Sequence, residues 1–316
     1  MRVLTYHRVA NPQDNPCLDP SLISATPSDF VRQMEYLARH YHVVSIDDVL
    51  GAIEGGRPIS SRAVLITFDD AYRDFAESAW PVLKRYGLPA ILFVPTAFPG
   101  HPERSFWWDA LYHAITFTPK RALRDALLGI LPSSSEQPRL ARLKELQREL
   151  KAIPHVEAMA RIEHIIQPLR VDTPPQPSTL TWDELRCLAK QGVALGAHTQ
   201  THPILTQMTP QEVRNEIRGS QDDLAREIGN VRPVFSFPSG EYDNGVVAIL
   251  KEEGFKAAFT TLDGQNDLRI QDPLRLCRTN ITRRTTPLIF RLRLWRWVSQ
   301  IDRLRHRRGT PILATP

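Results

Sequence analysis

Two adjacent carboxylates, Asp69 and Asp70, end a short apolar run and are the first residues whose types suggest chemistry. The run before them, residues 64–68, is apolar without a helical period, which is typical of a buried strand. Neighbouring strand side chains point to opposite faces, so both carboxylates can serve one site only where the backbone turns. One could then hold a metal ion while the other moves a proton. The alternative is structural, because Asp70 also suits a helix N-cap.

A second polar cluster, at residues 198–203, also follows a strand-like run. His198 and His202 are four residues apart, which is the spacing of a helical metal-binding pair. Gly196 before them and Pro203 after them favour a strand end and loop over the middle of a helix. A single histidine is usually an ordinary polar residue, but two at this spacing after a strand favour a metal site.

The two strand ends together offer one carboxylate and two imidazoles, from Asp70, His198 and His202. This set leaves coordination positions open, as a catalytic site requires and a closed structural zinc site does not. We therefore expect a divalent ion here, with Zn²⁺ first and Co²⁺, Ni²⁺ or Mn²⁺ as alternatives. A bound ion would lower the pKa of a water molecule, and Asp69 would be free to take its proton.

The elements that must position these residues alternate between strands and helices. Strand-like runs occur at residues 3–6, 43–46, 64–68, 90–94, 193–197, 234–237, 257–261 and 276–281. This alternation predicts an α/β fold with a mostly parallel sheet, namely a distorted (β/α) barrel of seven or eight units. It stops between about residues 101 and 177, where we expect helices and no strand. We interpret residues 1–285 as one barrel with a helical insertion at 101–177, followed by a basic amphipathic helix and tail at 286–316.

The composition bounds the class of protein. A chain of 316 residues that is 42% hydrophobic and 24% charged can bury a full core. Its formal charge of +5 is mild and predicts no nucleic-acid partner. Three widely spaced cysteines form neither a disulfide framework nor a CxxC site, and the N-terminal sequence has no signal-peptide core. We expect a cytoplasmic protein, peripheral at the inner face of the membrane if it binds lipid at all.

Three motifs resemble, in order and spacing, those of the polysaccharide deacetylase family, also called the NodB-homology or carbohydrate esterase 4 family. They are Thr67-Phe68-Asp69-Asp70, His198-Thr199-Gln200-Thr201-His202 and Phe237-Pro238-Ser239-Gly240. The resemblance covers about residues 1–281 and implies a distorted (β/α) barrel that removes N-acetyl groups from amino sugars with a metal ion. By position, it implies that Asp69 is the catalytic base. The same match makes Asp70, His198 and His202 the metal ligands, braced by Thr199.

The third motif departs from the family's usual Arg-x-Pro-aromatic-Gly. Ser236 stands at the arginine position, and Ser239 stands at the aromatic position. The family's arginine orients the catalytic acid, so another cation must do so here, and we expect Arg278 on the last strand. A surface or ion-pair arginine is the alternative. The backbone N–H of Ser239 could still stabilise an oxyanion, which needs no side chain, and Pro238 beside it is expected at the substrate.

The general acid also has no counterpart at the family's usual place, because no histidine lies between His202 and His306. However, Tyr6-His7 resembles the first strand of a branch similar to the biofilm-polysaccharide deacetylases, in which the barrel order is permuted. There the first strand supplies the acid. The match implies that His7 protonates the leaving amine, and we place Tyr6 at the substrate. A structural histidine is the alternative.

These residues predict N-deacetylation of an amino sugar in a polysaccharide, an oligosaccharide or a lipid-linked glycan. In the insertion, Trp107 and Trp108 could stack on a sugar face, with packing as the alternative for at least one of them. Two other functions stay open. The first is a non-catalytic, metal-dependent glycan binder that has lost the third-motif arginine. The second is a metal amidase that acts on a small non-sugar amide.

The C-terminal segment, residues 289–308, combines arginines with apolar residues at helical spacing. One face would carry Leu294, Trp297, Val298, Ile301 and Leu304. Basic residues with tryptophan on an amphipathic helix predict peripheral contact with an anionic membrane surface. The alternative is a last helix docked on the barrel with its charges in solvent.

Overall fold

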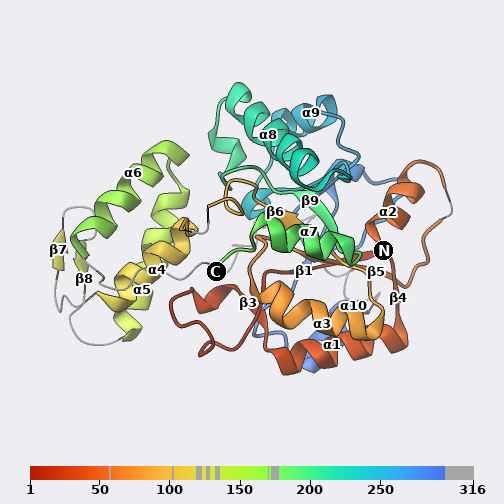
Figure 1. Cartoon of the computed structure of the whole chain (residues 1–316), viewed down its shortest axis with the longest axis horizontal. Helices are drawn as coiled ribbons and strands as arrows, with labels where there is room; N and C mark the ends of the chain where they lie inside the picture. Colours follow the sequence, from red (N-terminus) through yellow and green to blue (C-terminus); the bar gives the residue numbers. More distant parts are fainter. Residues whose placement is uncertain are drawn as a thin grey trace, which may run out of the picture.

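The computed structural model describes residues 1–56, 58–101, 103–118, 123–125, 129–131, 136–169, 171 and 178–295. Seven parallel strands form one curled sheet in the order β11–β10–β9–β6–β5–β1–β12, and β4 (His42–Val43) pairs with β5 off this path. The seven are β1 Arg2–Tyr6, β5 Ala63–Phe68, β6 Ile91–Val94, β9 Ala194–Ala197, β10 Val234–Ser236, β11 Ala257–Phe259 and β12 Thr279–Asn280. A parallel bridge between Phe259 and Leu276 brings the chain before β12 against β11. The expected distorted barrel is thereby confirmed (Figure 1).

Alternation along the strands separates two apolar layers. On β5, Val64, Ile66 and Phe68 join the cluster that packs against the surrounding helices. Leu65 joins a different cluster, to which β1, β6, β10 and β11 also contribute, inside the barrel. Thr67 and Asp69 share the face of Leu65, because residues two apart on a strand point the same way. The barrel interior is therefore apolar at one end and polar at the carboxyl ends of its strands.

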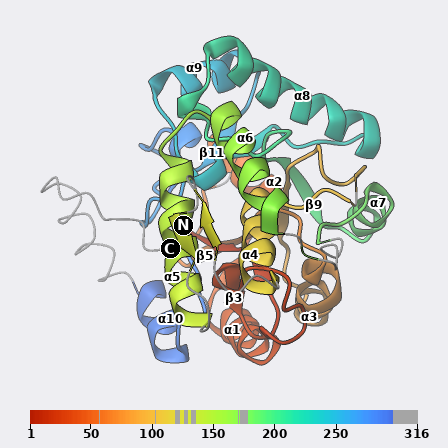
Figure 2. The ribbon, with the colours of Figure 1, turned by 90° about the vertical axis from the view of Figure 1, so that its left-hand side faces the viewer.

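Helices cover the outside of the sheet (Figures 1 and 2). They are α1 Pro27–His40, α2 Ile46–Ile53, α3 Trp80–Tyr86, α7 Trp182–Lys190, α8 Pro210–Ile228 and α9 Asn244–Glu252. Helix α7 begins with a capping box, in which the Thr181 side chain accepts from the Glu184 N–H and the Glu184 side chain accepts from the Thr181 N–H. Such caps contribute about 0.5–2 kcal/mol each. Helix α3 ends at Gly87, whose φ of 64° is left-handed and suits glycine.

The insertion packs around an apolar cluster of its own, which includes Leu111, Leu146 and Ile162. Its helices, α4 Trp107–Phe117, α5 Glu136–Lys151 and α6 His155–Ile166, lie together to one side of the barrel in Figure 1. Seen from that side in Figure 2, they stand in front of the strands. The expectation of no strand here is wrong. Strands β7 (Leu123–Asp125) and β8 (Gly129–Leu131) pair in antiparallel orientation. The sequence did not reveal them, because short apolar runs do not distinguish a strand from a helix.

Two other elements differ from expectation. Residues 43–46 were expected as one strand, but β4 ends at Val43, and Ser45 with Asp48 forms the capping box that starts α2. The helix expected over residues 289–308 is interrupted, because α10 (Pro287–Leu294) ends at Leu294 and Trp295 after it has an extended backbone. The rest of the expected apolar face lies outside the described residues. The short strands β2 (Arg8–Val9) and β3 (Ile23–Ala25) pair apart from the barrel. Within the described residues, no helix has the length and hydropathy needed to cross a bilayer.

Candidate active site

Strand register brings the predicted residues to one end of the barrel. Tyr6 pairs with Phe68, and the Asp69 N–H donates to the Tyr6 carbonyl at 3.0 Å, so His7 and Asp69 follow neighbouring strands side by side. Ala197 pairs with both β6 and β10, which places His198 at the same carboxyl edge. The ends of β1, β5, β9 and β10 therefore meet where α/β barrels carry their active sites.

The loops at this edge hold an unusual backbone. The described residues include five non-glycine positions with positive φ, and all five follow β5, β9 or β10: Asp70 (72°), Ala71 (50°), Thr199 (62°), His202 (60°) and Ser239 (55°). Each such conformation costs about 1–3 kcal/mol and persists only where its surroundings impose it. The turn at Asp70 explains how two adjacent carboxylates can both face the barrel mouth.

Asp70 faces two imidazoles. Its Oδ1 lies 3.4 Å from Nε2 of His198 and 3.3 Å from Nε2 of His202, and all three side chains are buried. Asp70 Oδ1 is nonetheless without a hydrogen-bond partner among the described residues. A tetrahedral ion with ligand bonds of about 2.0–2.1 Å would need ligand atoms about 3.3–3.4 Å apart. The donor atoms thus have the identity and spacing that a divalent ion requires.

The hydrogen bonds and pKa shifts of these three groups differ. Burial lowers the pKa of His198, but its contact with Asp70 outweighs burial and raises that pKa above its ordinary value. His198 Nδ1 lies 2.7 Å from the carbonyl oxygen of Ser236, which can only accept, so Nδ1 carries the proton and Nε2 is left facing Asp70. Burial raises the pKa of Asp70, but its contacts with His198 and His202 lower the pKa by more than burial raises it. The pKa of Asp70 therefore lies well below its ordinary value. Burial lowers the pKa of His202 and favours its neutral form.

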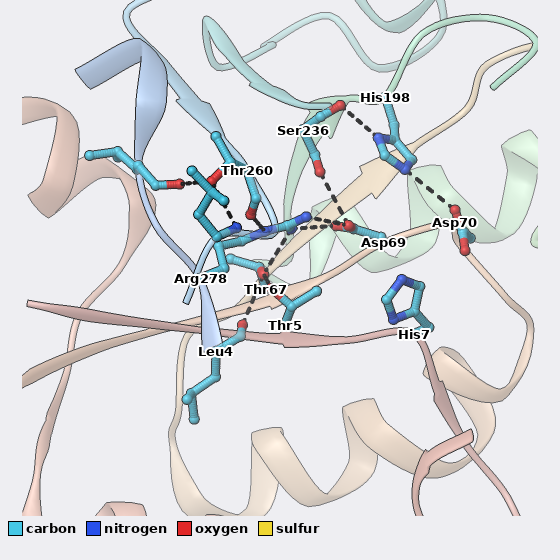
Figure 3. Close-up of polar contacts among 12 residues, drawn as sticks. Leu4, Thr5, His7, Thr67, Asp69, Asp70, His198, Ser236, Thr260 and Arg278 are labelled. Carbon is cyan, nitrogen blue, oxygen red and sulfur yellow. Dashed lines mark hydrogen bonds and ion pairs between the residues drawn. The ribbon is translucent and has the colours of Figure 1, made fainter. Parts of the chain in front are cut away.

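Asp69 has different partners, which Figure 3 shows. Arg278 donates to it through both arms, with Nη1–Oδ1 at 2.8 Å and Nη2–Oδ2 at 2.7 Å. Ser236 Oγ donates to Oδ2 at 3.2 Å. Burial raises the pKa of Asp69, but the positive charge of Arg278 outweighs it, and the pKa lies below its ordinary value. Asp69 is therefore an ionised carboxylate held in one orientation.

Arg278 occupies the position that the sequence suggested for it. It is 1% exposed, its Nε donates to the Thr260 carbonyl at 2.8 Å, and Thr67 Oγ1 lies 3.4 Å from Nη1. Ser236, at the family's arginine position, contacts the same carboxylate as Arg278. A cation from the residue just before β12 thus reaches the carboxylate that Ser236 of the third motif also contacts. The surface alternative for Arg278 does not hold.

The loop that carries His198 and His202 is held from within and from α8. The His202 N–H donates to Thr199 Oγ1 at 3.0 Å, as expected of a bracing hydroxyl. Glu216 on α8 accepts from the N–H groups of Gln200 and Thr201 at 2.7 and 2.9 Å. Sequence reasoning missed Glu216, because an acidic residue on an amphipathic helix looks like any solvated charge.

Helix α4 of the insertion also contacts the site. The Trp108 ring lies edge-on to His202 at 4.8 Å between centroids, and its Nε1 donates to the Tyr72 hydroxyl at 2.9 Å. Tyr72 in turn donates to Asp109 at 2.6 Å. Asp109 is fully buried, and burial raises its pKa to about 7. Sequence reasoning did not identify Tyr72 or Asp109, because their contact joins segments far apart in the chain.

Of the remaining predicted residues, two lie at the site and two are buried. His7 lies beside Asp69 and Asp70 in Figure 3. Ser239 is exposed and borders a pocket together with His202 and Trp107. Tyr6, in contrast, is fully buried against Phe30 and Phe68, so its expected contact with substrate does not hold. Pro238 is also buried, whereas its neighbour Ser239 on the same loop is exposed.

Comparison with known proteins places this geometry in a family. The model of the polysaccharide deacetylase family matches residues 56–122 and 138–258. The Bacillus subtilis protein YxkH, described only provisionally as a polysaccharide deacetylase, is 19% identical over 83% of this chain and 64% of its own length. A poly-β-1,6-N-acetyl-D-glucosamine N-deacetylase of Escherichia coli is 30% identical over 28% of this chain. The chain spans under two thirds of YxkH and matches 13% of the Escherichia coli protein.

Solved structures share the fold. The Streptococcus pyogenes deacetylase PplD, solved with acetate, superposes with a TM-score of 0.61 at 20% identity, covering 93% of this chain and 98% of that one. IcaB from Ammonifex degensii gives a TM-score of 0.57 at 18% identity, covering 93% and 97%. The family match extends over more than half of the sequence and includes Asp69, Asp70, His198 and His202. The chain therefore belongs to the polysaccharide deacetylase family, whose members are hydrolases acting on carbon–nitrogen bonds.

Proposed function

We propose that this chain removes the N-acetyl group from an amino sugar in a glycan, with a divalent ion held by Asp70, His198 and His202. The observation that carries the proposal is that the two adjacent carboxylates have different partners. Asp70 presents a buried oxygen that has no hydrogen-bond partner among the described residues to two imidazole nitrogens, while Asp69 is ionised and bound to Arg278. A structural ion pair or helix cap would not need both arrangements side by side.

The ion, Zn²⁺ in the first instance, would supply Lewis-acid activation of water and of the amide carbonyl. Asp69 has the free capacity to act as base. A carboxylate has about four lone-pair sites, and described donors occupy two on Oδ2 and one on Oδ1. The free site on Oδ1 would take the proton of the attacking water. The low pKa of Asp69 keeps it ionised at neutral pH.

His7 and Ser239 complete the proposed chemistry from the other sides. His7, on the loop after β1, would protonate the departing amine as acetate leaves. The backbone N–H of Ser239 would donate to the oxygen that becomes negative during attack. The φ of Ser239 is 55°, a left-handed value that non-glycine residues rarely adopt, and this value sets the direction of the Ser239 N–H.

The substrate class rests on the family and on the partial match to an enzyme named for poly-β-1,6-N-acetyl-D-glucosamine. We test it by loading the purified chain with Zn²⁺ and measuring acetate release from N-acetylated oligosaccharides, poly-N-acetylglucosamine and cyclic amides. The proposal expects acetate from a glycan and at least about a 100-fold loss in Asp69→Asn. Hydrolysis of cyclic amides alone would favour the small-amide amidase. Glycan binding without acetate release would favour the non-catalytic binder.

We also propose that α10 touches an anionic membrane surface at the cytoplasmic face. Apolar side chains of α10 are exposed, namely Leu288 by 67%, Ile289 by 38% and Leu292 by 40%, and Trp295 directly after the helix is 58% exposed. No aspartate or glutamate stands between residues 273 and 301, so every charged side chain of this segment itself is basic. Apolar area and positive charge together favour anionic headgroups.

Vesicle sedimentation tests this contact. Full-length protein should pellet with phosphatidylserine-containing vesicles more than with neutral ones, and Leu288→Glu with Leu292→Glu should abolish the difference. Ile270→Glu is the matched control, because Ile270 is 83% exposed but belongs to a turn at residues 268–270 rather than to α10. Equal pelleting of the α10 double variant and the control would contradict the contact.

A further inference from the structure

The insertion brings a charged side chain to the active site that none of the proposed roles uses. Lys151, the last residue of α5, borders the same pocket as His202 and Ser239. Trp107 and Ile153 line the pocket as well, which gives it an apolar wall beside a cation. The pocket therefore joins a proposed metal ligand, the proposed oxyanion loop and a lysine within one concave surface.

The position of Lys151 is fixed by the backbone around it. Gln207, on the turn after the His202 loop, donates from Nε2 to the Lys151 carbonyl at 2.5 Å. One turn earlier on α5, Gln147 Nε2 donates to Asp19 Oδ2 at 3.2 Å. These two hydrogen bonds hold the end of α5 against the barrel, and they place Lys151 at the edge of the pocket.

Lys151 is exposed at the rim of this pocket, and among the described residues its ammonium has no partner. In the part of the chain that the structure describes, it makes no hydrogen bond and no ion pair. The carboxylates that act on its charge from farther away are those of Asp19, Glu241 and Asp70. Asp19 already accepts from Ser21 and Gln147, and the Asp70 charge would be more than neutralised by a divalent ion.

We propose that Lys151 binds an anionic group of the substrate, a carboxylate or a phosphate next to the N-acetylated sugar. The substrate would then be an acidic glycan or a sugar phosphate rather than a neutral polymer. This inference rests on the proposed deacetylase function and names its substrate class. An ammonium is a compact point charge that suits a single anionic group, and the apolar wall suits the face of a sugar ring.

Binding measurements separate this inference from catalysis. The Zn²⁺-loaded Asp69→Asn chain would be titrated calorimetrically with N-acetylchitotetraose and with a tetrasaccharide that alternates N-acetylglucosamine and glucuronic acid. N-acetylglucosamine 1-phosphate against N-acetylglucosamine forms the phosphate arm. We expect the anionic member of at least one pair to bind roughly 10- to 100-fold more tightly, as a charge-assisted hydrogen bond allows. The arm that shows the preference identifies the anion.

Variants at position 151 then assign the preference to the lysine. Lys151→Met should bring the anionic-to-neutral affinity ratio close to one, and Lys151→Arg should retain most of it. Lys144→Met, an exposed lysine on the same helix, is the matched control and should keep the full ratio. Equal affinities within both pairs, including no binding of any of them at millimolar concentration, would overturn the inference. Acetate release by the unmodified chain would still decide the proposed function separately.

Discussion

Replacing Arg278 by methionine should destabilise the protein far more than removing a comparable ion pair from the surface. Arg278 is 1% exposed, and its two bonds to Asp69, of 2.8 and 2.7 Å, are the main reason that a buried carboxylate stays ionised. Removing one partner of a buried pair costs about 3–5 kcal/mol, because the other charge is left unpaired. For a chain of this length, that corresponds to a drop of about 5–8 °C in the thermal midpoint.

The stability penalty of Arg278→Met should depend on pH in a defined direction. The pKa of Asp69 is depressed in the folded protein, so Asp69 contributes stability above the unfolded pKa of about 4 and loses it as the pH falls through the folded pKa. Without Arg278, burial becomes the dominant influence and raises the pKa of Asp69 above its ordinary value. The penalty of Arg278→Met should therefore be largest at neutral pH and smaller at pH 5, where Asp69 of the variant can take up a proton.

Thermal unfolding by circular dichroism at pH 7 and pH 5 measures both effects. Arg269→Met is the matched control, because Arg269 makes an equally two-armed pair with Asp267, of 2.9 and 2.7 Å, but is 82% exposed. Its midpoint should change by no more than about 1 °C, since solvent screens such pairs. If Arg278→Met behaved like the control, or if its penalty grew between pH 7 and pH 5, the assigned role of Arg278 would be refuted.

Three further substitutions test separate parts of the site. His7→Ala should lower kcat by about 10²- to 10⁴-fold with unchanged metal content; metal loss in elemental analysis would instead make His7 a ligand. Glu216→Ala removes the acceptor for the N–H groups of residues 200–201 and should weaken Zn²⁺ affinity about 10- to 100-fold in a competition titration; an unchanged affinity would argue against its bracing role. Tyr72→Phe leaves buried Asp109 without its hydroxyl donor and should cost about 1–3 kcal/mol in chemical unfolding, so wild-type stability would contradict that role.

Some of the site could be predicted because its signals are local. Asp69 with Asp70, and His198 with His202, each stand beside a strand, and parallel strands carry their carboxyl ends to a common edge. The structure brings Asp70 and both histidines within 4.8 Å of one another. The barrel follows from alternating strands and helices in the same way, since each apolar period is visible in a short window.

The site features that could not be predicted depend on contacts between distant segments of the chain, or on the face of the sheet to which a side chain points. Tyr6 and His7 are neighbours at a strand end, and since Tyr6 packs among helices, only His7 faces the barrel mouth. Ser236 looked like a loss of the family's arginine, whereas it contacts Asp69 together with Arg278. Lys151 resembles any charged residue at the end of a surface helix until the insertion is folded against the site.

The central claim is that Asp70 holds a metal ion and that Asp69, its neighbour, does not. Elemental analysis of purified, dialysed protein tests it directly, with Asp69→Asn and Asp70→Ala compared against the unmodified chain. The account predicts one divalent ion per chain in the unmodified protein and in Asp69→Asn, and almost none in Asp70→Ala. Metal retained in Asp70→Ala, or lost in Asp69→Asn, would contradict it.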